Sequence, residues 1–419
     1  MAKNAMSNCD AQDSSLNEAS RPEDNAKWTR GVTMGMQQIP LLEMPSLGFS
    51  VTPELALRGR PNTVALTHEV SELLAGNAVV AVGVSGGKDS DACAIAVDRY
   101  LNEIGHAGPR CLIHADLGVV EWTSSLAGCK RLAERLGWEL VVVKRTGGGL
   151  MERWEDRWER CVARYENLEC VKLILPWSTP AMRFCTSDAK VAPITSELKK
   201  RFPSHDIINV TGVRRQESTS RSRMPVSGPA PKLSRKKTKG IVWNAIIEWP
   251  VEDVVYTIVN AGLTLHEAYT RFGNSRVSCS YCVLSSLGDL QASASCEANH
   301  GIYVRMVELE VKSGFSFQGN RWLADVAPHL LTEEQRERVA LSKQMAAART
   351  RVEAELHKHL LFSKGWPSSV PTHQEAELIA SVRRRVSELQ QLNAKFLTGQ
   401  EVMDRYAQLF DEKKRRNAA

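Results

Sequence analysis

Long hydrophobic runs are missing from this chain of 419 residues. A membrane-spanning helix needs about 18 or more consecutive apolar residues, and no segment provides them, so the sequence excludes a helical membrane protein. Residues 1–30 are rich in Asn, Ser, Asp and Glu and lack the apolar segment of a secretory signal. We therefore expect a cytoplasmic protein that makes no contact with membranes.

The composition also lacks the extremes that mark disordered or fibrous chains. Hydrophobic residues make up 43% and charged residues 24%, as in ordinary soluble globular proteins, and the length predicts two or three domains. The net charge of +6 permits a polyanionic partner without requiring one. The 10 cysteines, with no sign of export, favour metal binding or thiol chemistry over disulfides.

Four apolar segments have the character of buried parallel strands, and helical patterns separate them. The expected strands span residues 78–84, 110–115, 139–144 and 206–211, and the expected helices span 67–74, 89–102, 122–136, 150–165 and 187–201. This alternation predicts an α/β fold with a doubly wound, mostly parallel sheet, which binds ligands at the carboxyl ends of its strands. A further strand is expected at 241–249, and helices at 251–261 and 264–272.

The pattern predicts four parts along the chain. Residues 1–60 are expected to be a poorly ordered leader, and residues 61–250 an α/β domain. Residues 251–330 form a Cys-containing helical and loop subdomain that completes this core. Residues 331–419 are expected to be a charged, helical C-terminal extension.

Ser85-Gly-Gly-Lys-Asp-Ser90 lies directly between the first expected strand and the helix that follows it. Two glycines let the backbone approach an anion closely, and the loop amides together with the helix N-terminus can hold pyrophosphate. Lys88 adds a positive charge, and Ser85 and Ser90 add hydroxyl donors. A tight turn with a helix cap would use the same residues, but six matching positions in this context favour phosphate binding.

The loop resembles the PP-loop of the ATP pyrophosphatase superfamily, also called the adenine nucleotide alpha hydrolases. Four blocks further along the chain resemble the phosphoadenosine phosphosulfate reductase family within it. They are His114-Ala-Asp-Leu-Gly118, Arg183-Phe-Cys-Thr-Ser-Asp-Ala-Lys190, Gly212-Val-Arg-Arg-Gln-Glu-Ser218 with Arg221, and Ile246-Ile-Glu-Trp249. The blocks stand in family order across residues 75–290, so the resemblance implies a Rossmann-like PP-loop fold.

The resemblance also implies that ATP, with Mg²⁺, binds with its phosphates on residues 85–90. The nucleotide-binding residues would be Ser85, Gly86, Gly87, Lys88, Asp89, Ser90, His114, Asp116 and Gly212. The catalytic residues would be Lys88, Asp89, Asp116, Arg214, Glu217 and Arg221. Guanidinium groups suit phosphate or sulfate oxygens, and a carboxylate among them can hold an arginine in place or bind a metal. A solvated surface loop is the alternative for the arginines, and a capping carboxylate is the alternative for Asp116.

Two departures from the reductases of this family bear on the reaction. Those enzymes carry a nucleophilic cysteine in a C-terminal Glu-Cys-Gly-Leu/Ile-His motif, which this chain lacks. They generally lack a complete Ser-Gly-Gly-x-Asp-Ser loop, which this chain has. Both departures favour cleavage of ATP to AMP and pyrophosphate, so we expect an adenylating ATP pyrophosphatase acting in sulfur transfer or nucleic acid modification. A sulfonucleotide reductase and a non-catalytic nucleotide-binding subunit of a complex are the alternatives.

Cys279-Ser-Tyr-Cys282 is a Cys-x-x-Cys pair, with Cys296 after it and Cys185 in the Arg-Phe-Cys-Thr block. Thiolates in this pattern suit tetrahedral zinc or an iron–sulfur cluster. A redox-active dithiol and a buried thiol pair are the alternatives. The surrounding stretch is similar to the DNA phosphorothioation ATP pyrophosphatases, which carry a four-cysteine [4Fe–4S] cluster. Because Phe272 stands where that branch has one ligand cysteine, Cys296 would have to replace it.

The segment 212–240 is strongly basic, with nine Lys or Arg residues and one acidic residue. Such a loop beside an ATP site can hold the phosphate backbone of a nucleic acid, and the basic residues 413–416 can add to it. A solvated loop whose first arginines serve only the nucleotide is the alternative. A sulfur donor and further subunits of a complex, bound through the charged C-terminal helices, are the other partners that we expect.

Overall fold

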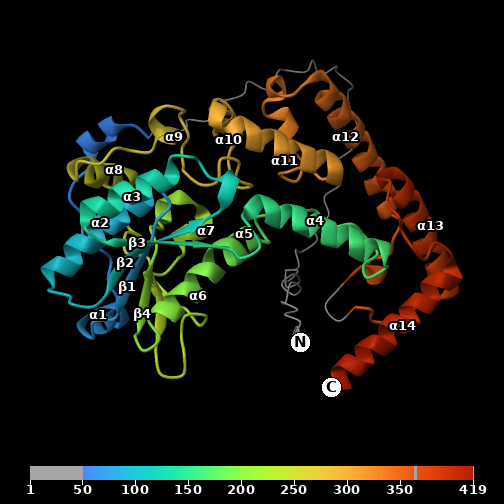
Figure 1. Cartoon of the computed structure of the whole chain (residues 1–419), viewed down its shortest axis with the longest axis horizontal. Coiled ribbons are helices and arrows are strands. Elements are labelled where there is room, and N and C mark those ends of the chain that lie inside the picture. Colours follow the sequence, from blue (N-terminus) through green and yellow to red (C-terminus); the bar gives the residue numbers. More distant parts are fainter. Residues whose placement is uncertain (1–50, 363–365, 419) are drawn as a thin grey trace, which may run out of the picture.

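A six-stranded sheet forms the centre of the protein in the computed structural model, which describes residues 51–362 and 366–418 (Figure 1). The strands are β1 (Val79–Gly83), β2 (Arg110–Asp116), β3 (Glu139–Lys144), β4 (Ile207–Val210), β5 (Ser227–Pro229) and β6 (Gly240–Trp243). Their order is β3-β2-β1-β4-β6-β5, and every neighbouring pair is parallel except β5–β6. The expected doubly wound α/β fold is confirmed, and its strand order reverses between β1 and β4, where such sheets bind ligands.

Strand β1 is buried on both faces because its side chains alternate between two apolar layers. Val80 and Val82 face the layer that contains α1 (His68–Ala75), α2 (Lys88–Glu103), α3 (Ser125–Leu136) and α8 (Val251–Asn260). Val79 and Ala81 face the layer that contains α6 (Ala192–Arg201). The expected strands and helices up to residue 211 are therefore present, and a π-helical turn at Ser187–Val191 precedes α6.

Two expectations beyond residue 211 were wrong in detail. The strand expected at 241–249 ends at Trp243, because the Asn244 side chain bonds Thr211 and the carbonyl of Pro225 and turns the chain. The helix expected at 264–272 is reduced to α9 (Glu267–Thr270), which His266 caps by accepting a hydrogen bond from Ala268 N. The basic segment 212–240 contains a short 3₁₀ turn, α7 (Thr219–Ser222) and β5.

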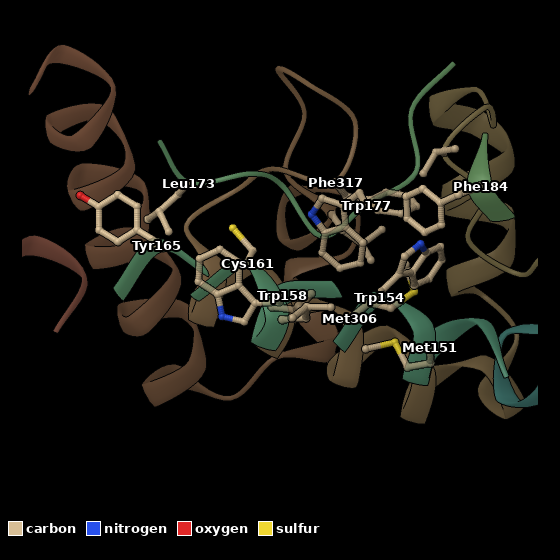
Figure 2. Close-up of a cluster of buried hydrophobic side chains, with 14 of the residues drawn as sticks. Met151, Trp154, Trp158, Cys161, Tyr165, Leu173, Trp177, Phe184, Met306 and Phe317 are labelled. Atoms are coloured by element: carbon tan, nitrogen blue, oxygen red, sulfur yellow. The ribbon is translucent and has the colours of Figure 1, made fainter. Parts of the chain in front are cut away.

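The molecule also has a helical half beside the sheet, and α4 (Leu150–Glu166) connects it to the α/β half (Figure 1). The remaining helices are α5 (Phe184–Thr186), α10 (Leu287–Ala294), α11 (His300–Ser313), α12 (Glu333–Glu353), α13 (His373–Gln390) and α14 (Gly399–Ala418). Figure 2 shows the apolar core that α4 shares with them, in which Trp154 and Phe317 both contact Trp177, with ring centroids 5.4 and 5.2 Å from it. No helix in the described ranges is long and apolar enough to cross a bilayer.

The leader expected at 1–60 falls almost entirely outside the described residues, which begin at 51. The part that is described packs on the α/β layer, because Arg60 N donates to Asp253 Oδ1 at 3.0 Å and a 3₁₀ turn, Pro53–Arg58, lies against α8. Helix α8 in turn packs on α2. The three boundaries between the four expected parts therefore stay predictions.

Candidate nucleotide and cysteine site

The loop at residues 85–90 leaves the carboxyl end of β1 and enters α2 at Lys88. Gly86 has φ +71°, and a Cβ there would lie 2.7 Å from the carbonyl oxygen of Ser125, so both the conformation and the space require glycine. Gly87 is the N-cap of α2, and a Cβ on Gly87 would lie 3.3 Å from the Cβ of Val277. The loop amides and the N-terminus of α2 therefore lie at the carboxyl end of β1, where the strand order reverses. Such a group of backbone N–H donors is suited to binding an anion.

Lys88, Asp89 and Arg214 form a chain of charges at the start of α2. Lys88 Nζ lies 2.9 Å from Asp89 Oδ2, and Arg214 Nε lies 2.5 Å from Asp89 Oδ1. Burial raises the pKa of Asp89, but the charges of Lys88 and Arg214 outweigh it and lower that pKa. Burial lowers the pKa of Lys88, but Tyr269 and Asp89 outweigh it and raise that pKa. All three groups are therefore charged, and Lys88 and Arg214 are only 5% and 4% exposed.

The segment after β4 lies against the start of α2, because the two backbones approach each other closely. A Cβ on Gly212 would lie 2.4 Å from the carbonyl oxygen of Asp89. Glu217 accepts from Arg214 N at 2.9 Å and pairs with Arg221. The structure thus brings together the predicted residues of the phosphate loop and those of the Gly212–Ser218 block.

His114 and Asp116, predicted near the nucleotide, occupy two different environments at the end of β2. His114 is 1% exposed, and its ring nitrogens lie 3.0 Å from Val84 O and 3.2 Å from Glu121 Oε2. Burial opposes its charge, but contacts with Cys129 and Glu121 outweigh this and raise the pKa of His114 to about 10. His114 therefore holds Val84, the residue between β1 and the loop, from within the core. Asp116 is at the surface and pairs with Lys144 at 3.1 Å.

The cysteine segment lies directly over the phosphate loop. The Tyr269 hydroxyl accepts from Lys88 N at 3.3 Å and from Val277 N at 3.1 Å, so it joins the two segments. Two residues further on, Cys279 forms an antiparallel bridge with Glu121. The Cys-x-x-Cys pair therefore starts beside the carboxyl ends of β1 and β2.

The four predicted metal-ligating cysteines lie around one segment of the chain, but they do not all share the same surroundings, and Cys296 acts on Tyr281 between Cys279 and Cys282. Cys279 interacts electrostatically with Cys282 and Cys185, and burial raises the pKa of the Cys279 thiol well above its usual range. Cys185 and Cys279 also pack against the same apolar core. Cys296 instead lies in a separate apolar cluster with Trp122 and Ala268.

The spacing of these thiols bears on the metal. Tetrahedral zinc, with Zn–S bonds of about 2.3 Å, holds its sulfurs roughly 4 Å apart. In the described part of the chain, one group of three His, Cys, Asp or Glu residues has all its ligand atoms within 4.8 Å of one another. It consists of His357, His359 and Glu375, so it contains no cysteine. Cys185, Cys279 and Cys282 are therefore not spaced as ligands of a single zinc ion in this structure.

Several residues of the site were missed from the sequence because nothing in their local pattern marks them. They are Tyr269, His266, Arg131 and Asp91; all but Tyr269 line a small cavity behind Gly86. Burial lowers the pKa of His266 to about 4, so it is neutral; its Nδ1 accepts from Ala268 N, and its Nε2 bonds the Ser124 hydroxyl. Burial raises the pKa of Asp91 from 3.8 to about 7.

A family model of the phosphoadenosine phosphosulfate reductase domain matches residues 79–294. The chain belongs to this family. The match does not select a branch, so the likeness to the DNA phosphorothioation enzymes stays a prediction. A search of solved structures finds the U34-tRNA thiolase NcsA from Methanococcus maripaludis with its [4Fe–4S] cluster, at 15% identity and a TM-score of 0.32, covering 67% of this chain and 88% of that one. No curated protein matches.

We predict that Gly212→Ala destabilises the protein by about 1–3 kcal/mol, the cost of forcing an extra group into a packed site, because its methyl group would collide with the Asp89 carbonyl. The free energy of unfolding from urea titration measures this. Gly228→Ala is the matched control in the same basic segment, since nothing lies within 4 Å of that Cβ. Equal stability of the two variants would contradict the close approach of β4 and α2.

We predict that Asp91 makes stability fall as the pH rises from about 4 to 7. In this window the folded state keeps a proton that the unfolded state loses, so the free energy of unfolding decreases. Asp91→Asn removes this effect, so its stability relative to the unmodified protein is expected to be greater at pH 8 than at pH 5. Exposed Asp411→Asn is the control. A difference that does not change with pH would show that Asp91 is ionised in both states.

Proposed function

We propose that the protein is an AMP-forming ATP pyrophosphatase that activates its substrate by adenylation for sulfur transfer, with nucleic acid as the substrate class. The observation that carries this proposal is the contact between the phosphate loop and the cysteine segment through Tyr269 and Val277. This contact supports the proposal because the loop at residues 85–90 and the group of thiols then lie at one edge of the sheet. A sulfonucleotide reductase would also have to bind a nucleotide, but it would not need to cleave ATP.

The charges at the start of α2 suit the departure of pyrophosphate. The loop amides and Lys88 would hold the phosphates that leave, and they would stabilise the charge that develops between the α and β phosphates. Asp89 is paired with two cations, so it would orient Lys88 and Arg214 rather than bind a metal. Asp116 is 33% exposed in its side chain and has oxygen capacity left, so it fits Mg²⁺ arriving with ATP.

The thiols would serve the sulfur-transfer half of the reaction. Cys185, Cys279 and Cys282 would hold an iron–sulfur cluster, whose chemistry is to bind and deliver sulfur or electrons. The Glu121–Cys279 bridge and the Glu121–His114 contact would keep this segment at a fixed place relative to the residue before the phosphate loop. In this arrangement the activated substrate would meet the thiols without leaving the sheet edge.

Asp89→Asn is expected to lower ATP-dependent pyrophosphate release about 100-fold or more, because the neutral amide no longer orients Lys88 and Arg214 on the phosphates. Release from radiolabelled ATP with total cellular RNA or DNA as acceptor measures it. Glu103→Gln, at the exposed far end of the same helix, is the control and should keep full activity. Unchanged turnover of Asp89→Asn would overturn the assignment of the loop.

Iron analysis after anaerobic purification tests the cysteines one by one. Cys282→Ala is expected to lose the visible absorbance and most of the iron and sulfide, because it removes a thiolate ligand. Cys296→Ser is the matched comparison and should keep both, since Cys296 lies in a different cluster. Full iron content in Cys282→Ala, or stoichiometric zinc in the unmodified protein, would contradict the cluster.

A further inference from the structure

The basic segment 212–240 does not lie at one place but runs across an edge of the sheet. Its first part, with Arg221 and Arg223, follows β4 at the carboxyl end, on the side of the phosphate loop. Strand β5 is antiparallel to β6, so it carries the chain back to the amino end. The remaining lysines lie on the hairpin that extends there beyond the sheet (Figure 1). The sequence-based expectation of one loop beside the ATP site therefore holds for the first part alone.

The hairpin joins the end of α6 to form what we call the amino-end cluster. The Arg235 side chain donates to the carbonyl of Pro203 at 2.6 Å and also to the carbonyl of Lys199. Lys199 Nζ in turn donates to the carbonyl of Lys232 at 3.2 Å. Arg235 and Thr238 form a bridge, which leaves Lys236 and Lys237 at the exposed tip. The amino-end cluster consists of Lys199, Lys200, Lys232, Arg235, Lys236 and Lys237.

The charge of this cluster is not compensated locally. Among the described residues, none of its six cations forms an ion pair with a carboxylate. The summed charge of the six side chains is as large as the net charge of +6 of the whole chain. Two of the acidic groups around it pair with other cations, and Asp206 keeps its charge but bonds a backbone amide rather than one of the six cations. Arg201 pairs with Glu139, Lys239 pairs with Glu69, and Asp206 accepts from Lys239 N.

We propose that the amino-end cluster anchors the phosphate backbone of a nucleic acid, which then follows β5 to the phosphate loop. This inference rests on the proposed function and names how its substrate is held. From Asp206 to Thr211 the chain crosses the sheet over roughly 16 Å, at about 3.3 Å per residue. A free nucleotide cannot contact both ends, whereas a strand with about one phosphate per 3.4 Å places several along this path.

A membrane surface fits the cluster less well than a nucleic acid does. Interfacial binding combines cations with apolar side chains that enter the lipid. The large hydrophobic residues that are exposed in the described structure include none between 199 and 206 or between 230 and 239. Leu233, the large apolar residue of the hairpin, is buried.

Lys236→Gln with Lys237→Gln tests the anchor in the full-length protein. Fluorescence anisotropy with a folded RNA hairpin and with duplex DNA, each at several salt concentrations, gives the affinity and its salt dependence. Loss of two phosphate contacts should weaken binding roughly tenfold or more near 0.1 M salt and lower the slope of log K against log salt by about 2. Lys312→Gln with Lys358→Gln removes the same charge from the helical half and should bind like the unmodified protein.

The outcomes separate this proposal from the proposed function. Equal affinity and slope in the two double variants would overturn the anchor, and so would binding of anionic phospholipid vesicles in place of both nucleic acids. Whichever nucleic acid shows the larger loss in Lys236→Gln with Lys237→Gln is the one that the cluster holds. Basal pyrophosphate release without nucleic acid should be unchanged in this variant. If the unmodified protein releases none, the proposed function fails, while the loss of binding still supports the anchor.

Discussion

The ion pair between Asp89 and Arg214 is the constraint around which the site is built. It joins the first turn of the helix after β1 to the segment after β4, the two strands between which the sheet order reverses. A buried pair of this kind costs much of what it gains, because both groups lose water. It is stabilised here by further partners: Lys88 on the carboxylate, and Gln216 and the Trp249 carbonyl on the guanidinium. What it provides is a fixed geometry for two cations beside the loop at residues 85–90.

A second chain of contacts extends from this loop to the cysteines. His114 bonds the carbonyl of Val84, directly before the loop, and also Glu121, whose backbone pairs with Cys279. Because both ring nitrogens of a protonated imidazole are donors, the raised pKa of His114 suits both contacts at once. His114, which the sequence suggested as a nucleotide contact, is thus a buried residue that links the loop to the cysteine segment.

Strands β1 to β4 were readable from the sequence because each is a short run of mainly apolar residues between helical patterns, whereas β5, which is Ser-Gly-Pro, carries no such pattern. Residues 139–144, for example, were expected as a strand and form β3. The phosphate loop was equally plain, since its residues are adjacent in the chain. The position of Cys296 was not readable, because its distance from the other thiols depends on how Trp122 and Ala268 pack around it. The division of the basic segment was also hidden, since three residues pairing as β5 send the lysines to the opposite end of the sheet.

The packing of the helical half explains how Cys185 reaches the other thiols. It lies in the long connection between β3 and β4, far from Cys279 in the chain, and its position depends on the core that α4 builds around Trp154 and Trp177. Cys279 packs against that same core, whereas the α2 helix that follows the phosphate loop belongs to the apolar layer of the sheet. Cys185 and Cys279 on one side and the loop at residues 85–90 on the other are therefore supported by two different cores. The Tyr269 hydroxyl ties the cysteine segment to the start of α2, and the Glu121–Cys279 bridge and the bond from Ser280 N to Val120 O tie it to the residues after β2, so these contacts contribute to the alignment of the two halves of the site.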